Sequence, residues 1–148
     1  TAANMAVAAD AAAFCVVVSD KMRAQLGCSS IALLGGATKG AAPERPGIAP
    51  LAAIKSALSH TGTRNTGITC AEIMEAFAVQ AIACVQGAGF DPRVVNIGGG
   101  ALARGHPIGA SGAVNAVRLY HELRKTGGRG LATIAAAGGI ATALILAA

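Results

Sequence analysis

One histidine of this chain has a setting that suits proton-transfer chemistry. His106 lies in the stretch Asn96–Gly112, NIGGGALARGHPIGASG, which contains six glycines and one imidazole. Pro107 biases the preceding histidine toward an extended backbone, so the imidazole is presented from a stiff loop. Gly109 and Ser111 then open a predicted helix, whose free N–H groups and positive dipole end would lie near the imidazole. This arrangement suits a base that works beside a developing oxyanion.

The same stretch also has a plainer interpretation. Glycines at 98, 99 and 100 let the backbone take a positive φ or press against a neighbour. A glycine-rich turn that leads into a helix and carries a structural histidine would give the same pattern. The spacing alone leaves both interpretations open.

Four segments of the chain resemble, in the right order, signatures of the thiolase family. TAANMAVAADAAA at Thr1–Ala13 is similar to the stretch that opens the family's C-terminal half, and MEAFAVQA at Met74–Ala81 resembles its NEAF motif. GGALARGHPIGASG resembles the GHP signature, and TGGRGLATIAAAGG at Thr126–Gly139 resembles the last one. The resemblance implies an α/β fold, namely the C-terminal βαβ half of the five-layered α-β-α-β-α thiolase fold, as one domain over residues 1–148.

The resemblance also implies a reaction and a partner. Thiolases make or break a carbon–carbon bond in 3-oxoacyl-CoA thioesters, and His106 matches the GHP histidine that activates their nucleophilic cysteine. That cysteine sits in the family's N-terminal half, so we expect a hetero-oligomer with a larger N-terminal-half chain. The substrate would be a coenzyme A thioester, with no bound cofactor. Gly105, Pro107 and Gly109 are expected to shape the substrate loop.

Two positions depart from the family's pattern. Met74 falls where the family has asparagine, and a thioether cannot donate a hydrogen bond as that amide does. Ala135 falls where the family has its second cysteine, the acid/base that handles the substrate's α-proton. The backbone amides near Ala137 and Gly138 are still able to line an oxyanion hole. The alternative to an acyltransferase subunit is therefore a non-catalytic thiolase-like subunit with a structural or binding role.

Other polar and thiol side chains have ordinary interpretations beside functional ones. Glu75 matches the second residue of NEAF, where a buried structural carboxylate is as good an expectation as a functional one. Cys70 and Cys84 lie in apolar surroundings typical of core cysteines. His60 and His121 lie on polar stretches and are expected to be exposed.

Thr1 raises one further alternative. A mature chain that begins with threonine can use the hydroxyl as a nucleophile and the free amine as its base. Because Thr1 also matches the threonine that begins the family's TAGN segment, a thiolase divided into two polypeptides is the plainer expectation.

The composition narrows the class of partner and compartment. The formal net charge is +5, which is compatible with an anionic thioester, but the basic residues are scattered and do not form a nucleic-acid patch. Four cysteines form no CxxC pair, which argues against zinc. Reduced thiols fit a cytoplasmic protein best.

The expected elements alternate, which predicts a largely parallel sheet with helices over it. We expect strands at Ala11–Ser19, Ser30–Leu34 and Gly67–Met74, and helices at Lys21–Leu26 (capped by Asp20), Leu51–Ser59, Glu75–Gly87 and Ser111–Lys125. In the last helix Val114, Val117, Leu119 and Leu123 should face inward, and Arg118, Glu122 and Lys125 outward. Leu131–Ala148 carries no charge, but two buried strands meeting at Gly138–Gly139 explain it better than a membrane span.

Overall fold

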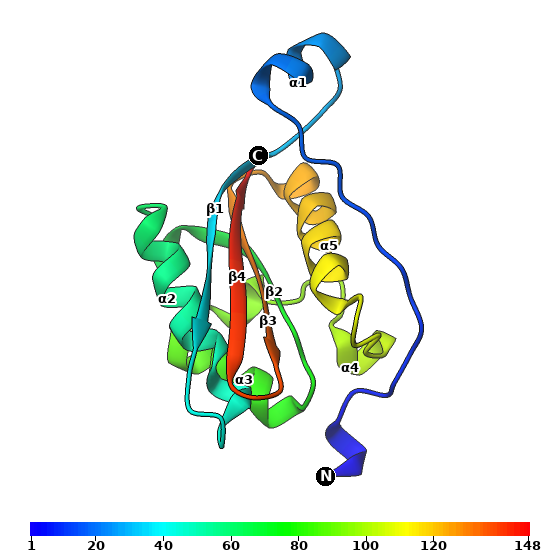
Figure 1. Cartoon of the computed structure of the whole chain (residues 1–148), viewed down its shortest axis with the longest axis vertical. Helices are drawn as coiled ribbons and strands as arrows, with labels where there is room; N and C mark the ends of the chain where they lie inside the picture. Colours follow the sequence, from blue (N-terminus) through cyan, green and yellow to red (C-terminus); the bar gives the residue numbers. More distant parts are fainter.

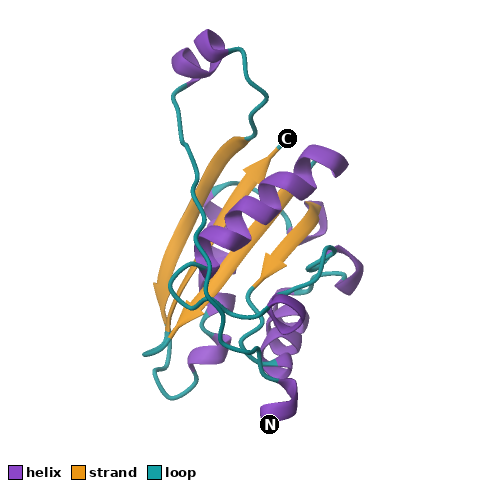
Figure 2. Cartoon of the chain, turned by 90° about the vertical axis from the view of Figure 1, so that its right-hand side faces the viewer, coloured by secondary structure: helices purple, strands orange, loops and turns teal.

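A computed structural model describes all 148 residues, which form three layers: one sheet in the middle and helices on each of its two faces (Figure 1). Helix α2 packs on one face of the sheet, with α3 beside it, and α5 covers the other face, as Figure 2 also shows. The strands are β1 (Ala32–Gly40), β2 (Ile68–Ile73), β3 (Arg129–Ala136) and β4 (Ile140–Ala147). The α-helices are α1 (Asp20–Leu26), α2 (Pro50–His60), α3 (Ala78–Ala88), α4 (Ala101–Arg104) and α5 (Ser111–Thr126).

The sheet is mixed, so the expectation of a largely parallel sheet is wrong. The strand order is β1-β4-β3-β2, and only β2 and β3 run parallel. The alternating pattern correctly indicated one crossover, from β2 through α5 to β3. β3 and β4 pair antiparallel through the hairpin at Gly138–Gly139, and β1 pairs antiparallel with β4. The hydrophobic periodicity within one strand does not encode the direction in which that strand pairs with another, so these two pairings were not predicted.

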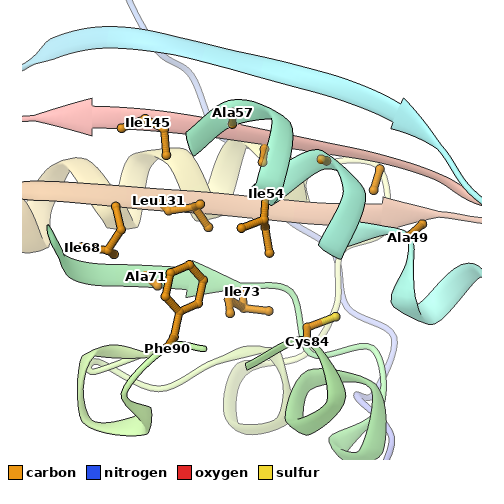
Figure 3. Packing of buried hydrophobic residues seen from close by; sticks show 13 residues of the cluster. Ala49, Ile54, Ala57, Ile68, Ala71, Ile73, Cys84, Phe90, Leu131 and Ile145 are labelled. Carbon is orange, nitrogen blue, oxygen red and sulfur yellow. The ribbon is translucent and has the colours of Figure 1, made fainter. Parts of the chain in front are cut away.

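Alternation along the strands divides the core between the two faces. Leu131 and Ile145 point toward Ile54 of α2 in the larger cluster, together with Phe90 (Figure 3). Ala132 on β3 and Cys70 on β2 point to the opposite face and pack against Leu119 and Leu123 of α5. Both faces of the sheet are therefore covered by helices, as in other α/β domains.

The predicted strand at Ala11–Ser19 is wrong for this chain. These residues are extended, but they pair with no strand, and Phe14 and Val16 are 88% and 89% exposed. The β-branched run has the composition of a strand buried on both faces, yet the sheet offers it no free edge at this place. We call residues 5–19 the arm; it runs beside α4 and α5 and then rises to α1 (Figure 1).

Other element boundaries differ in smaller ways. Helix α1 is capped by the Ser19 hydroxyl, which accepts from the Met22 amide, rather than by Asp20. Strand β1 does not end at Gly35–Gly36 but continues to Gly40 with an irregularity in its register. Helix α3 starts at Ala78 rather than at Glu75. The elements predicted at Leu51–Ser59, Gly67–Met74 and Ser111–Lys125 are confirmed to within one residue at each end.

The inward and outward faces of α5 need one correction. Leu119 and Leu123 are fully buried as expected, whereas Val114 and Val117 are half-buried. Arg118 and Glu122, both expected to face solvent, have side chains that are only 22% and 16% exposed. Arg118 turns toward the buried Glu72 and forms an ion pair with it, whereas Glu122 pairs with Lys125. The uncharged C-terminal run forms β3 and β4, and none of the chain's helices combines the length and apolar character that a bilayer crossing needs.

Candidate functional site

The His106 loop is fixed from both sides by backbone contacts. Helix α4 ends at Arg104, and Gly105 follows with φ of +93°, where a Cβ would lie 2.7 Å from the Cβ of Ala9. The His106 amide donates to the Val7 carbonyl at 2.7 Å, and the Ala9 amide donates back to the His106 carbonyl at 3.4 Å. The start of the arm thus forms a short parallel bridge with the histidine's own backbone.

The imidazole of His106 has one nitrogen committed and one free. Nδ1 lies 2.7 Å from Oγ of Ser111, the first residue of α5. The Ser111 hydroxyl donates its proton to the Pro107 carbonyl at 2.9 Å, so Oγ is left to accept from an Nδ1–H. In the tautomer in which Nδ1–H donates to Oγ, the lone pair is on Nε2, which is the nitrogen that a general base needs.

Burial adjusts the same ring for that role. It lowers the pKa of His106 below its ordinary value of 6.5, because the charged imidazolium loses solvation. The neutral imidazole is therefore the favoured form near neutral pH. The predicted closeness of His106 to the start of a helix is confirmed, and the contact is made through a side chain.

His106 opens onto a cavity of about 420 Å³, in which ten of the fifteen lining residues are hydrophobic. The structure brings three other predicted site residues, Met74, Ala135 and Ala137, to the same cavity. Exposed apolar side chains also line it: Phe77, Ile108 and Ile140. The size suits a small ligand with an apolar part.

A smaller neighbouring cavity, of about 110 Å³, contains two more of the predicted residues. Gly105 and Pro107 line it, and Met74 lines both cavities and so stands between them. Gly109 and Gly138 line neither of the two, and both are exposed. The structure thus brings six of the eight predicted site residues to the two cavities and leaves two outside.

The wall formed by Met74 and Ala135 is apolar. Met74 is only 4% exposed and packs with Ala6, Ala101 and Ile134. The remaining candidate donor there is the Ala137 amide, in the turn between β3 and β4, which donates to no group of the chain. This wall therefore offers a backbone donor but no side chain able to transfer a proton.

Glu75 has a structural place in the site, as one of the two expectations had it. Its carboxylate accepts from the Asn96 side-chain amide at 2.6 Å and from the Leu102 amide at 3.0 Å. A Cβ at Gly100 would overlap the Glu75 carboxylate, so a larger residue there would displace the carboxylate from these hydrogen bonds. Glu75 lines neither cavity and holds the glycine-rich turn in place.

Asn96 extends the edge of β2 in place of a further strand. Its side chain accepts from the Ile73 amide at 2.8 Å and donates to the Ile73 carbonyl at 2.9 Å, while its own amide donates to Ala71. The residue has a φ of +48°, which asparagine tolerates better than most side chains. The glycine-rich turn is thereby attached to the strand that leads to Met74.

The remaining candidates lie outside the site. Cys70 and Cys84 are buried, and burial raises the pKa of Cys70 to about 11, so both fit the expected core role. His60 and His121 are exposed, as expected. The Thr1 hydroxyl and ammonium both donate to the Asn4 side chain, and Thr1 lines neither cavity.

Two supporting contacts were missed by sequence reasoning. The spacing of His106 and Ser111 contained the Nδ1 contact, but only the loop geometry brings the two side chains together. Glu72 stood as a lone charge in the apolar strand TCAEIM, a signal for a buried ion pair that was present in the sequence.

Comparisons with known proteins point consistently to one family. The family model described as thiolase, C-terminal domain, matches residues 27–148. Two acetyl-CoA acetyltransferases, from Chromobacterium violaceum and Cupriavidus necator, align with 97% of the chain, and over that length they are 40% and 42% identical to it. The chain spans 37% of the length of each of these two relatives.

Solved structures confirm the expected fold. The crystal structure of human mitochondrial 3-ketoacyl-CoA thiolase matches with a TM-score of 0.84 and 32% identity, over 88% of this chain and 34% of that one. The Bacillus anthracis acetyl-CoA acetyltransferase matches with a TM-score of 0.83 and 32% identity, over 87% of this chain and 33% of that one.

Proposed function

Because this chain belongs to the thiolase family through its C-terminal domain, we propose that it supplies His106 as the base of an acyl-CoA acyltransferase site. In this site a cysteine of a larger N-terminal-half thiolase chain is the nucleophile. In the condensation direction, Nε2 takes the thiol proton and the thiolate attacks the thioester carbonyl. The acyl group then moves to the cysteine, and the leaving coenzyme A thiolate takes the proton back from the imidazolium. The reaction class is 3-oxoacyl-CoA thiolysis or, in the opposite direction, Claisen condensation.

One observation carries this proposal: the imidazole has its Nδ1 bound to Ser111 and faces a cavity that suits an acyl group. A purely structural histidine in a glycine-rich turn has no need of a free nitrogen at a cavity of about 420 Å³. General bases of this kind contribute about 10²–10⁴ in rate. A coenzyme A thioester is the proposed substrate, and none of the steps assigned to this chain's residues requires a metal.

The arm supports the proposed hetero-oligomer. Its Phe14, Val16 and Val17 are among the most exposed large apolar side chains of the chain, and apolar surface of this kind is normally covered by a partner. We propose a cytoplasmic role in lipid metabolism, which suits the exposed free thiols of Cys15 and Cys28.

A second candidate function, a non-catalytic subunit, is favoured by Met74 and Ala135. Neither side chain can donate a proton or a strong hydrogen bond, and Met74 is packed into its neighbours rather than free to move. Losing one oxyanion donor typically lowers a rate by about 10²–10³. Between these two functions lies an intermediate case, in which acyl transfer or thioester hydrolysis persists through His106 while carbon–carbon chemistry is lost.

The test is co-expression of this chain with a nucleophile-bearing thiolase chain from the same genome. Coenzyme A-dependent cleavage of acetoacetyl-CoA and release of free coenzyme A from acetyl-CoA are then measured, with His106→Ala and the exposed His121→Ala as a matched pair. Either activity, if it needs both chains and falls by about 10²–10⁴ only in His106→Ala, supports the acyltransferase. A tight and folded complex without either activity favours the non-catalytic subunit.

A further inference from the structure

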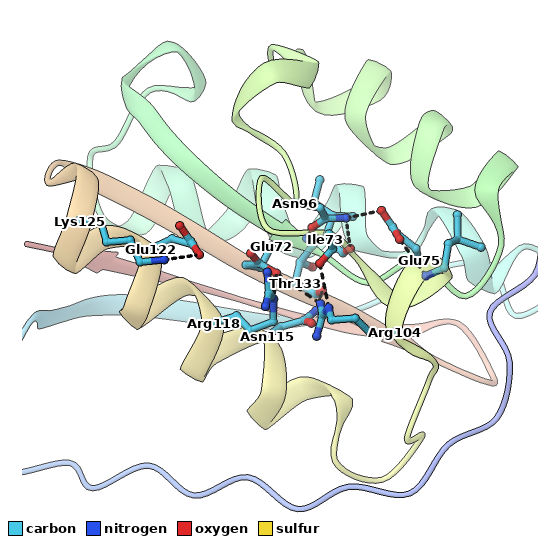
Figure 4. A network of polar contacts seen from close by, with 12 residues as sticks. Glu72, Ile73, Glu75, Asn96, Arg104, Asn115, Arg118, Glu122, Lys125 and Thr133 are labelled. Carbon is cyan, nitrogen blue, oxygen red and sulfur yellow. Dashed lines mark hydrogen bonds and ion pairs between the residues drawn. The ribbon is translucent and has the colours of Figure 1, made fainter.

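A buried charge cluster lies between β2 and α5, next to the smaller cavity that Arg104 lines (Figure 4). The Glu72 side chain on β2 is 1% exposed, and Arg118 of α5 donates from Nε to its Oε2 at 3.1 Å. Nη2 of Arg104, the last residue of α4, lies 4.0 Å from the same oxygen. Two guanidinium groups thus share one buried carboxylate.

Stability alone does not explain this cluster. Oε1 of Glu72 and Nη2 of Arg118 are buried and have no hydrogen-bond partner. Burying ions costs several kcal/mol of solvation each, and apolar residues at such places are often as stable or more stable. Incompletely satisfied polar groups in a native core call for another explanation, such as a fixed geometry that the protein needs.

The geometry that the cluster fixes is that of the His106 loop. Arg104 stands two residues before His106, and its Nε also donates to the Gly99 carbonyl at 2.9 Å, which closes the glycine-rich turn. Glu72 lies two residues before Met74 on β2, and Arg118 lies on the helix that Ser111 begins. One carboxylate therefore connects the three elements that surround the imidazole.

We propose that Glu72 is a positioning residue, which acts through Arg104 to hold the His106 loop at the distance where Nδ1 bonds Ser111. Glu72 lines neither cavity, so it touches no substrate and acts only through other residues. The inference rests on the proposed function only in taking His106 as the base. The placement of the ring itself is measurable without turnover.

The readout is the tautomer of the imidazole in the full 148-residue chain. Nitrogen chemical shifts of ¹⁵N-histidine-labelled protein distinguish Nδ1–H from Nε2–H, and a His106→Gln sample identifies which signals belong to His106. Wild-type chain should have His106 as the Nδ1–H form. Glu72→Gln should give a mixture of tautomers and should speed amide exchange over residues 99–106 about two- to fivefold, as expected for the loss of one part-exposed ion pair to Arg104.

Two further variants separate positioning from general stability. Arg104→Gln leaves the Glu72–Arg118 pair intact, so it keeps the proposal testable if Glu72→Gln does not fold. Because it removes the hydrogen bond from Arg104 Nε to the Gly99 carbonyl as well as the ion pair to Glu72, we expect the same tautomer change and about tenfold faster exchange. Asp20→Asn removes an exposed carboxylate that pairs with Arg23 on the same helix, α1, and should leave the His106 ring unchanged.

Folded Glu72→Gln or Arg104→Gln protein that retains the wild-type His106 tautomer and exchange rates would overturn the proposal. So would a change of equal size in Asp20→Asn. Because no substrate is involved, an inactive complex in the co-expression assay would count against the proposed function and leave this result standing.

Discussion

The two walls of the larger cavity differ in how completely they are equipped for chemistry. On one wall stands His106, whose Nδ1 is bound to the Ser111 hydroxyl in the lining of the smaller cavity, so that Nε2 is left free. On the other, Met74 and Ala135 offer no side-chain donor, and the candidate donor is the Ala137 amide. The contrast indicates that the step needing a base is supported better than the step needing an acid at the α-carbon.

Ala135→Cys should have the largest effect, because it adds a titratable thiol to the apolar wall. A positioned acid/base contributes about 10²–10⁴ in rate, so carbon–carbon cleavage by the assembled protein should rise by up to that factor. The measurement is coenzyme A-dependent acetoacetyl-CoA cleavage, with Ala52→Cys on α2 as the control for an added thiol. Equal rates in both variants would show that the apolar wall does not limit the reaction.

Met74→Asn sharpens the same comparison with a donor rather than an acid. An oxyanion donor is worth about 10²–10³ in rate, but the polar side chain replaces a packed thioether and should cost about 2 kcal/mol or more of stability. The rate of acetoacetyl-CoA cleavage should therefore rise, while the urea midpoint of unfolding should fall. A faster enzyme with unchanged stability would contradict the packing that we describe for Met74.

Ser111→Ala tests the contact that orients the His106 imidazole. The Nδ1 of His106 loses its acceptor, so the ring should populate both tautomers and acyl transfer should fall about tenfold, the size of one lost hydrogen bond. Ser111→Thr keeps a hydroxyl and is the matched control. An unchanged rate in Ser111→Ala would mean that the backbone contacts of the loop alone orient the ring.

The smallest effect concerns stability and pH. Burial lowers the pKa of His106 in the folded chain, so the unfolded chain, with a pKa near 6.5, binds the proton more readily. Stability should therefore fall as pH decreases through 6.5 toward the folded pKa. Urea unfolding at about pH 8 and about pH 5 should show a smaller loss in His106→Asn than in wild type. His60→Asn, on an exposed position, should behave as wild type.

Much of the site was predictable from local sequence, because glycine, proline and histidine at fixed spacing determine the loop. His106, Met74, Ala135 and Ala137 were expected together because their segments resemble thiolase signatures, and they line one cavity. Helices α2 and α5 followed from their apolar periodicity.

The rest depended on long-range pairing. The run at Ala11–Ser19 has the residues of a strand, but strand formation needs a partner edge that its own sequence does not provide. Arg118 lay on the side of α5 expected to face solvent, until the fold placed Glu72 opposite it. The direction of strand pairing and the partners of single charges are properties of the assembled sheet.

The most direct test of the central claim is acyl transfer in a single turnover. The co-expressed complex is mixed with acetyl-CoA, quenched and analysed by intact mass, once with wild-type chain and once with His106→Ala. We predict an acetyl adduct on a cysteine of the larger chain that forms with wild type and fails to form on the same timescale with His106→Ala. An adduct that forms equally fast with both would contradict the role of His106 as the activating base.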